Sequence, residues 1–343
     1  MWLLPSGPDQ IGETFARAIS ETGYDGCGER NQGLQGRMAH QNIFSGNPLD
    51  RAGDLRNDSE WLAEQEANPE AKAMVLWEGR PLVEETAEGP RLTWLSLKHA
   101  RDIVPDRDVF LGLWKEAPVF AIEFEGSIDP TDGPLGGLGV FHEMRGAAAI
   151  LPAQDAAMAG GAKSLFDWRR KHGFCANCGT LSETTSGGWK RRCPACGTEH
   201  FPRVDPVTIM LPVYKGGPEP ICLLGRQAAW PVGRMSALAG FLEPGESIEE
   251  ACAREVKEEA GLTVIDTAYH SSQPWPFPSQ LMIGLIAEVS DDQARPDQTE
   301  LESVAWLTRA EAKAVIAGEH PTIQAPPPFA IAHSLIKAWV EEG

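Results

Sequence analysis

The sequence predicts an α+β fold in three successive parts. Three observations favour it: apolar runs of strand length in the first part, closely spaced cysteine pairs in the middle, and an acidic helix with its own capping residues in the last part. A chain of 343 residues is long enough for two domains and a small module. We therefore expect domains at 1–150 and 203–343, joined by a linker helix and a cysteine-bearing module at 151–202.

The first part contains apolar runs separated by turn residues, which suits a mostly antiparallel sheet. These runs span 73–77, 91–97, 109–114 and 119–125. A short helix is expected near 60–67, and the Gly-rich and Pro-containing stretch 128–139 predicts a boundary. Residues 153–171 are expected to form a helix that carries its apolar segment 165–168 toward the cysteine pairs.

The last part is expected to hold strands on both sides of one well-capped helix. The strands are predicted at 206–214, 221–227, 281–289 and 303–307, and a final helix near 329–341. Between the second and third strands, residues 240–262 read GFLEPGESIEEACAREVKEEAGL. Ser247 suits an N-cap, Glu250 completes a capping box, and Gly261 suits the left-handed residue that ends a helix. We therefore predict a helix over 248–260.

This helix carries three glutamates on one face, because Glu255, Glu258 and Glu259 stand at positions i, i+3 and i+4. Like charges at this spacing repel each other. Mg²⁺ or Mn²⁺ would remove the repulsion, since both cations bind oxygen ligands. From the glutamates alone, a solvated acidic helix face is the alternative.

The cysteine pairs predict a structural zinc site. Cys175 and Cys178 form one C-x-x-C knuckle, and Cys193 and Cys196 form a second one after 14 intervening residues. Thiolates in two short pairs suit tetrahedral Zn²⁺, and a site with four cysteine ligands has no open position for catalysis. Disulfides and a redox pair are the alternatives. Disulfides are disfavoured in a chain without a secretion signal. A redox C-x-x-C pair does not require a second C-x-x-C pair at this spacing.

Residues 272–278 read SQPWPFP and predict a rigid connector, because prolines at alternate positions remove backbone donors. Trp275 and Phe277 would be displayed on this connector. The alternative is a proline-rich loop whose aromatic side chains fill the core.

The whole chain has a formal charge of −19, which argues against broad contact with a nucleic-acid backbone. It contains no run of 18 apolar residues, so we expect no contact with a membrane. The first residues, MWLLPSGPDQ, lack the features of a signal peptide, and we expect a cytoplasmic protein. Cys222 and Cys252 are expected to be small core residues.

Residues 240–262 resemble the Nudix box, G-x5-E-x7-R-E-U-x-E-E-x-G-U with U apolar, and every fixed position is matched. The resemblance implies a Nudix fold, which is an α/β/α sandwich with a mixed sheet. It also implies hydrolysis of diphosphates linked to a nucleoside. The three glutamates of the helix face would hold the catalytic metal, Glu246 would support the site, and Arg254 would orient a glutamate.

The order of zinc ribbon, Nudix box and SQPWPFP resembles the NADH pyrophosphatase (NudC-like) branch of this family. The segments 47–51 (NPLDR), 201–203 (FPR) and 326–328 (PPP) also fit that branch. The resemblance implies hydrolysis of NAD(H) to NMN(H) and AMP, a homodimer, and an N-terminal domain with a degenerate Nudix-like fold.

The same resemblance implies the residues that bind substrate. They are Phe241, which stacks on a base, Phe201 from the partner subunit, Gln273, Trp275 and Phe277 of SQPWPFP, Gln280 where the branch has serine, and Ala330. A further glutamate that assists metal binding or water activation matches Glu300, with Glu302 as the fallback. Arg226 and Gln227 are candidates to approach phosphate, and equally candidates for plain surface residues.

Other functions stay open at this point. The same chemistry would remove NMN from NAD-capped RNA, or cleave a broader set of substrates such as ADP-ribose. Outside the enzymes, the alternative is a regulatory zinc-ribbon protein on an inactive Nudix scaffold. The retained glutamates of the box argue against that alternative.

Overall fold

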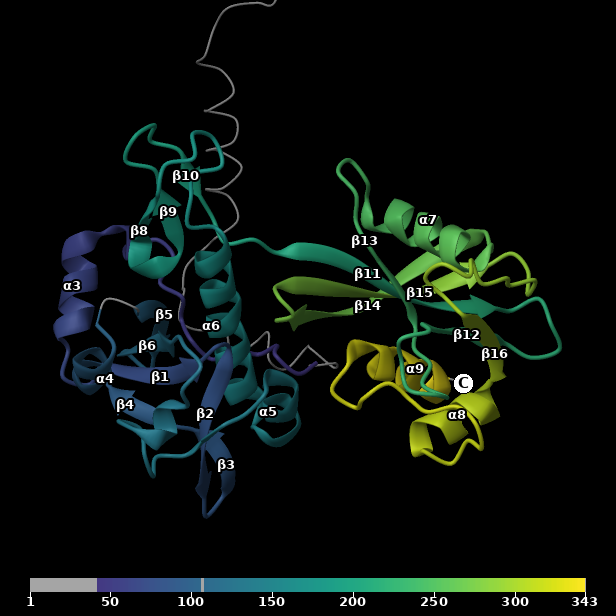
Figure 1. Cartoon of the computed structure of the whole chain (residues 1–343). Helices are drawn as coiled ribbons and strands as arrows, with labels where there is room; N and C mark the ends of the chain where they lie inside the picture. The colour runs from purple at the N-terminus through teal and green to yellow at the C-terminus, as the bar shows by residue number, and fades with distance from the viewer. Residues whose placement is uncertain (1–41, 106–107, 343) are drawn as a thin grey trace, which may run out of the picture. The chain divides into compact units, whose positions relative to one another are not determined.

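A computed structural model describes residues 42–105 and 108–342 of the chain (Figure 1). The first 41 residues of the predicted N-terminal domain therefore lie outside the described residues. The described part contains two larger sheets and one small three-stranded sheet, which follow one another along the chain. This order agrees with the predicted α+β organisation.

The first sheet has seven strands and is mostly antiparallel, as predicted. Its strands are β1 Lys72–Trp77, β2 Arg80–Thr86, β3 Gly89–Leu92, β4 Trp94–Ser96, β5 Asp108–Trp114, β6 Ala117–Phe124 and β7 Val140–Phe141. The central order is β3-β2-β1-β6-β5, and the β1–β6 pair is parallel. The sequence reading missed β2 and β7.

The predicted single strand at 91–97 is wrong, because two strands and a helix share that segment. β3 pairs with β2, whereas β4 pairs with β1, so the chain changes partners at Thr93. The backbone N–H of Thr93 donates to the Leu82 carbonyl, at 3.0 Å. Helix α4, Leu97–Ile103, then begins at Leu97 with Ser96 as its N-cap.

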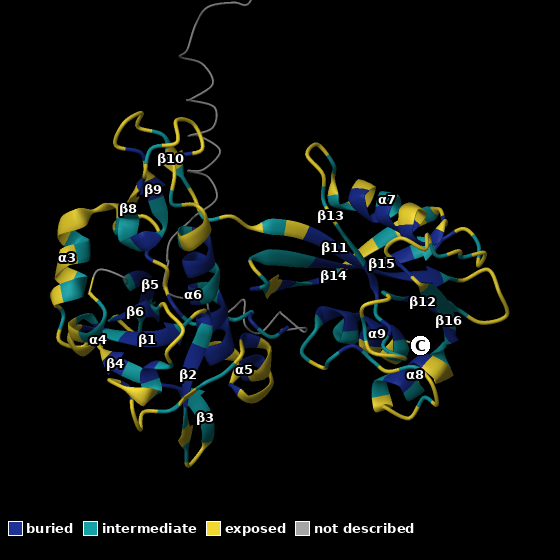
Figure 2. Ribbon diagram, in the orientation of Figure 1, coloured by how far each residue is buried: buried dark blue, intermediate teal, exposed yellow. Residues whose placement is uncertain are grey.

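The predicted helix near 60–67 is confirmed as α3, Ser59–Ala67, and Asp58 caps it. The predicted helix at 153–171 is confirmed as α6, Ala153–Lys171, and α5 spans Met144–Ile150. Two single-turn helices, η1 Leu55–Asn57 and η2 Pro130–Asp132, complete this region. Much of α6 is buried, whereas α3 has no buried residue (Figure 2).

The buried face of α6 belongs to the core of the first sheet. Leu165 and Phe166 share one apolar cluster with Met74 and Val109, and Trp189 of the cysteine-bearing module packs against that cluster. The predicted division at 150 grouped α6 with the cysteine module instead. The division stays a prediction, but the apolar face of α6 packs mainly on the first sheet.

The cysteine-bearing module is a small antiparallel sheet with two matching turns. Its strands are β8 Glu183–Thr185, β9 Lys190–Arg192 and β10 Glu199–His200, with η3 Ser186–Gly188 between the first two. Gly179 and Gly197 follow the two knuckles with φ of 75° and 74°. Only glycine adopts this left-handed conformation at little cost, which explains the glycine after each knuckle.

The last sheet has six strands in the order β14-β15-β11-β12-β16, with β13 paired to β11. Its strands are β11 Asp205–Tyr214, β12 Ile221–Arg226, β13 Leu238–Phe241, β14 Val264–Trp275, β15 Gln280–Val289 and β16 Ser303–Thr308. β11 and β15 are parallel, and the other pairs are antiparallel. The sheet is therefore mixed, as the Nudix resemblance implies.

Helices cover both faces of this sheet (Figure 1). Alternate residues of β11 explain the two faces: Leu211 packs with α8, Arg309–Ala317, and α9, Ile331–Glu341, while Met210 packs with α7, Ile248–Ala260. Successive strand residues point to opposite faces. The result is an α/β/α sandwich, in which the two clusters of buried side chains form separate cores.

The two cysteines that were predicted to be core residues lie in these clusters. Cys222 belongs to the cluster of α8 and α9, and Cys252 belongs to the cluster of α7. Burial raises the pKa of each thiol to about 12. Both are therefore uncharged at neutral pH and act as small core residues, as predicted.

The predicted rigid connector at 272–278 is wrong for its first half. Residues 272–275 continue β14 and pair with β15, where Pro274 lies opposite Leu281. β14 is the outer strand of the sheet, so one side of its backbone needs no partner and tolerates proline. The remaining residues form the turn between β14 and β15, with a cis bond between Phe277 and Pro278.

Candidate active site

Helix α7 presents the glutamate cluster, and its ends follow the sequence prediction. Ser247 and Glu250 form both hydrogen bonds of the capping box, and Gly261 ends the helix with φ of 72°. The helix has an apolar face that includes Cys252 and Val256. Its packing turns Glu255 and Glu259 inward and leaves Glu258 exposed.

Arg254 holds three of the four box glutamates. Its Nε and Nη2 donate to the two carboxylate oxygens of Glu246, at 2.6 and 2.9 Å. Its Nη1 donates to Glu255 at 2.8 Å and to Glu258 at 3.0 Å. The Arg254 guanidinium lowers the pKa of Glu246 to about 2, so Glu246 is a permanent anion at neutral pH.

Nη2 of Arg254 also donates to the backbone carbonyl of Phe241, at 2.8 Å. This bond ties the helix to the end of β13. The side chain of Phe241 itself is 53 % exposed. Arg254 therefore links the glutamates to the strand that carries a predicted substrate-binding residue.

Gly240 lies directly beside the carboxyl group of Glu255. A Cβ atom at position 240 would lie 1.8 Å from Cδ of Glu255, which is far inside van der Waals contact. The first glycine of the box is therefore required by space rather than by backbone conformation. Any side chain there would displace Glu255.

Glu259 is the most buried glutamate of the cluster and is 3 % exposed. Burial, together with the nearby charges of Glu255 and Glu300, raises its pKa to about 8. Its Oε2 atom is buried and has no hydrogen-bond partner in the described part of the chain. An unpartnered buried oxygen is unfavourable unless a cation or a donor binds it.

Glu300 stands on a loop whose shape is set by Asp297. The Asp297 carboxylate accepts hydrogen bonds from the backbone N–H groups of Glu300, at 3.0 Å, and Leu301, at 2.9 Å. Burial raises the pKa of Glu255 and of Glu259, and the charge of Glu300 adds to the rise in each. Glu302, the fallback for this position, pairs with Arg226 instead. The structure thus brings Glu300, not Glu302, toward the cluster.

The glutamate cluster fits a divalent cation by its chemistry, although its oxygens are not gathered tightly. Carboxylate oxygens are the ligands that Mg²⁺ and Mn²⁺ prefer. A cation would also stabilise the buried Oε2 atom of Glu259, which has no hydrogen-bond partner in the described part of the chain. Among the described residues, only the cysteine group brings three or more ligand atoms within 4.8 Å of one another. Arg254 instead bonds Glu255 and Glu258, so metal binding here requires these carboxylates to turn.

A cavity of about 220 Å³ lies next to Glu259 in the last domain. It is mostly apolar, and β-strand residues such as Ala239 and Met282 form part of its lining. Trp275 and Ala330 of the predicted substrate-binding set also line it. A larger hollow, of about 690 Å³, lies between α3, β5 and the cysteine module and contains none of the predicted site residues. The smaller cavity is the substrate candidate because it reaches Glu259 of the cluster.

Gln273 lines the cavity, but its polar atoms are engaged with the backbone. Its Nε2 donates to the carbonyls of Ile43, at 3.2 Å, and Phe329, at 2.7 Å. Its Oε1 accepts from the backbone N–H of Ile331, at 2.8 Å, which supplies the cap that Ala330 cannot give to α9. The structure places Gln273 as a support of α9 rather than as a free donor to substrate.

The aromatic residues of SQPWPFP have different surroundings. Trp275 stacks on Phe329, with ring centroids 6.2 Å apart, and borders the cavity. Phe277 packs on the first core cluster, and the guanidinium of Arg145 lies 4.1 Å from its ring centroid. Trp275 packs on the same cluster, so the core-filling alternative describes both rings; of the two, only Trp275 also faces the candidate site.

Besides Phe277, three predicted substrate-binding residues lie outside this cavity. Phe201 is 64 % exposed, as expected of a residue without a partner in its own chain. Gln280 pairs with Trp275 across the β14–β15 hairpin and lines another hollow, beside Arg203. Phe241 borders neither space. Within the described residues, Phe201, Gln280 and Phe241 therefore do not surround a single ligand-binding space.

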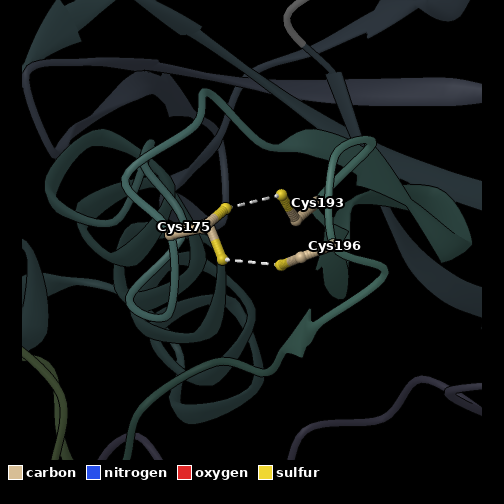
Figure 3. A group of neighbouring side chains, drawn as sticks. Cys175, Cys193 and Cys196 are labelled. Atoms are coloured by element: carbon tan, nitrogen blue, oxygen red, sulfur yellow. Dashed lines mark hydrogen bonds between the residues drawn. The ribbon is translucent and has the colours of Figure 1, made fainter.

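The four cysteines form the second candidate site (Figure 3). The Cys175 and Cys196 sulfurs lie 3.6 Å apart, and the Cys178 and Cys193 sulfurs lie 3.5 Å apart. A tetrahedron of ~2.3 Å Zn–S bonds has sulfur–sulfur edges of about 3.8 Å. A disulfide requires about 2.05 Å. The geometry therefore fits Zn²⁺ and does not fit the disulfide alternative.

Some residues of the candidate sites were not identified from the sequence. Asp297 shapes the Glu300 loop, and Trp230 lines the cavity from the loop after β12. His200 donates or accepts at 3.3 Å from the Cys175 sulfur. No spacing rule marks these positions, because each depends on a contact between distant segments. Gln227, a candidate for phosphate contact, also lines the cavity.

Comparison with known proteins agrees with this architecture. Family models described as NUDIX domain, NADH pyrophosphatase-like rudimentary NUDIX domain and NADH pyrophosphatase zinc ribbon domain match residues 205–325, 70–168 and 170–201. The α/β/α sandwich and its box helix thus define a protein of the Nudix class.

Its relatives define the branch. NAD-capped RNA hydrolase NUDT12 of Macaca fascicularis is 34% identical, over 88% of this chain and 73% of that protein. NAD-capped RNA hydrolase NudC of Deinococcus radiodurans is 34% identical, over 76% of this chain and 86% of that protein. NAD(P)H pyrophosphatase NUDT13, mitochondrial, of Homo sapiens is 40% identical over 60% of each chain. The chain belongs to the NADH pyrophosphatase (NudC-like) branch of the Nudix hydrolase family.

Proposed function

We propose that this protein hydrolyses the pyrophosphate bond of NAD(H) and releases NMN(H) and AMP. The observation that carries the proposal is the cavity in which Trp275 and Ala330 meet Glu259. An apolar space bordered by an aromatic ring suits a flat base, and an anionic cluster at one side suits a cation that binds the diphosphate. The names of the relatives support the same chemistry.

The box glutamates would hold the catalytic cation, with Mg²⁺ or Mn²⁺ as the proposed metals. A cation held there would supply charge neutralisation for the diphosphate oxygens and a lowered pKa for a bound water molecule. Glu255, Glu258 and Glu259 are the proposed ligands, and Glu300 assists them from its loop. Arg254 bonds Glu246 and Glu255 and so keeps the cluster together until the Glu255 carboxylate turns toward the cation.

Proton acceptance in this scheme belongs to a carboxylate of the same cluster. Glu300 is the proposed acceptor, because it is exposed and its carboxylate forms none of the hydrogen bonds that occupy Glu246 and Glu255. The Glu300 charge also contributes, after burial, to the raised pKa of Glu255 and of Glu259, which supports a place beside them. An exposed carboxylate beside the metal ligands can serve as a general base.

The substrate-binding proposal includes a second subunit. Phe241 and Phe201 are both more than half exposed. Exposed aromatic rings of this size are available to stack on a nucleobase or to meet a partner. A homodimer in which Phe201 of one subunit completes the site of the other would use both rings. Gln280 stands where the branch has serine, and we propose that it contacts substrate from the β14–β15 hairpin.

The test is product analysis with purified protein. Incubation with NADH and Mn²⁺ or Mg²⁺, followed by chromatography, is expected to give AMP and NMNH in equal amounts. Omission of metal should abolish the reaction. Intact NADH with either metal would contradict the proposal.

NAD-capped RNA is the second candidate substrate. The observation that favours it is that relatives at 34% identity carry the name NAD-capped RNA hydrolase. The charge of −19 limits an extended RNA footprint, so we expect contact mainly with the cap. The same assay with NAD-capped RNA beside NADH decides between them. Comparable kcat/KM values on RNA would make the capped RNA a substrate of equal standing.

The structural role of zinc and the location of the protein complete the proposal. Zn²⁺ would be held by the cysteine group and would have no catalytic part, because cysteine fills all of its positions. No helix in the described chain is long and apolar enough to cross a bilayer. A cytoplasmic location, expected from the sequence, is part of the proposal.

A further inference from the structure

Arg226 contacts two of the loops that border the candidate substrate cavity. It is the last residue of β12, and its side chain is 13% exposed. Its Nη1 pairs with the carboxylate of Glu302, and its Nη2 donates to the backbone carbonyl of Trp230, at 2.7 Å. Its own carbonyl accepts from the backbone N–H of Glu302, at 2.8 Å. One side chain thus joins residues 230 and 302.

The first of these loops forms a wall of the cavity. Gln227, Trp230 and Ser236 all line it. Trp230 is placed by a turn, in which its N–H donates to the carbonyl of Gln227 at 3.1 Å. Among the residues that the structure describes, Arg226 donates the one hydrogen bond that reaches the Trp230 backbone from outside this turn. Ser236 is held separately by backbone hydrogen bonds to Gly225, so loss of Arg226 would free the part of the wall at Trp230.

The second loop carries Glu300 toward the glutamate cluster. Leu301, the next residue, lines the cavity and is 3% exposed. Asp297 fixes one end of the loop through the N–H groups of Glu300 and Leu301. Arg226 fixes the other end through Glu302. The position of Glu300 between these two ends depends on both.

We propose that Arg226 is a positioning residue that couples the substrate wall at Trp230 to the metal side of the site at Glu300. This inference rests on the proposed function for its substrate, NADH. A guanidinium donates from separate nitrogens in a fixed fork, so it serves a carboxylate and a carbonyl at once. Lysine carries the charge at a single point and satisfies the carboxylate alone in this geometry.

The two contacts predict separable effects. In R226Q both contacts are lost, so KM for NADH and the metal concentration for half-maximal rate should each rise by about tenfold, the scale of a lost charged hydrogen bond. In R226K the ion pair with Glu302 remains, so the metal requirement should recover while KM stays raised. In E302Q the carbonyl contact remains, so the metal requirement should rise while KM stays near the parent value.

The experiment compares these variants with K215Q, which removes an exposed ion pair with Glu288 elsewhere on the same sheet. KM, kcat and metal dependence are measured for NADH, and Tm is measured for every variant. A purely structural role would lower Tm and leave KM and the metal dependence unchanged. If R226Q matches K215Q in both kinetic quantities, or R226K restores both together, the coupling is wrong.

A calorimetric titration with Mn²⁺, in the absence of substrate, separates this inference from the proposed function. R226Q is expected to bind Mn²⁺ about tenfold more weakly than K215Q. If the parent protein leaves NADH intact, the proposed function fails, and the titration still decides whether Arg226 supports the metal side. Equal Mn²⁺ affinity in R226Q and K215Q overturns the inference.

Discussion

The glutamates of the box share one cation, and they share it unequally. Arg254 bonds Glu246, Glu255 and Glu258, but none of its hydrogen bonds reaches Glu259. Glu259 is nevertheless the one with the raised pKa of about 8 and the unpartnered oxygen. A divalent cation would give Glu259 the positive partner that Arg254 gives to the other three glutamates. These contacts explain how one arginine holds three of the box glutamates, and they support the proposal that a metal binds the fourth.

Substitution of Glu258 tests the metal assignment without disturbing the core. Its side chain is 58% exposed, so E258Q should keep the fold and Tm. Loss of one anionic ligand should reduce kcat for NADH by about a hundredfold or more, on the scale of a lost charged contact in a transition state. Steady-state kinetics at saturating Mg²⁺ measure this.

The matched control is E249Q, an exposed glutamate in the first turn of the same helix. It should turn over NADH at the parent rate. An E258Q variant that is as active as E249Q would show that Glu258 holds no metal.

The low pKa of Glu246 predicts a pH dependence of stability. Glu246 has a pKa of about 2 in the folded protein against an ordinary 4.5, so its carboxylate favours the folded state. That contribution is present above pH 4.5 and is lost as pH falls toward 2. The Tm difference between the parent and E246Q, measured in metal-free buffer, should therefore be largest near neutral pH and vanish near pH 2. A difference that stays constant across this range contradicts the Arg254 contact.

Helices and strands differ in how far the sequence could define them. α7 was predicted to the residue, because its cap, its apolar face and its terminal glycine are all local signals. β14 was missed over residues 264–271, and its end was read as a connector, because proline usually excludes a strand. An outer position in the sheet makes proline acceptable, and no local pattern reveals which strand is outermost.

The same distinction applies to the candidate sites. Fixed spacing predicted the box glutamates and the four cysteines as candidate ligand sets, since the members of each set lie close together in sequence; the structure brings the four cysteines together. It could not show that Gly240 is required by the Glu255 carboxyl, nor that Gln273 caps α9. Those roles depend on which distant segment packs there. Spacing therefore predicts the chemistry of a site better than its supports.

The cap of α7 offers a test at this scale. In S247A the Glu250 N–H loses its acceptor, which should destabilise the helix start by about 1 kcal/mol. Amide hydrogen exchange in the first turn of α7 should then be about fivefold faster. S247D, which retains an acceptor, is the control. Equal exchange in S247A and the parent would mean that packing alone fixes this end of the helix.

Across the whole molecule, the cysteine module is fastened to the first sheet. The indole N–H of Trp189 donates to the carbonyl of Phe110, at 2.6 Å. A Cβ at Gly187 would lie 2.9 Å from Phe110, and one at Gly188 would lie 3.0 Å from Val109, so this loop lies flat against β5. The guanidinium of Arg56 lies 4.1 Å from the Trp189 ring centroid. Folding of the module and of the first domain should therefore be linked.

Removal of one zinc ligand tests this linkage. C178S should lose zinc, because three thiolates and a hydroxyl bind it much more weakly. The free energy of zinc binding is folding free energy for such modules. Zinc content should therefore fall together with Tm and solubility. The substitution leaves the box glutamates and Arg254 unchanged. Metal analysis and thermal unfolding of the purified variant measure both.

The control is A195S, which adds a hydroxyl at an exposed position of the second knuckle and removes no thiolate. It should retain zinc, Tm and activity. C178S that remains soluble should hydrolyse NADH with kcat near the parent value at low temperature, because the glutamate cluster lies in another sheet. A zinc-free variant with unchanged Tm would contradict a structural role. A zinc-free variant with unchanged Tm but no turnover would instead place the zinc in the chemistry, against its filled set of cysteine ligands.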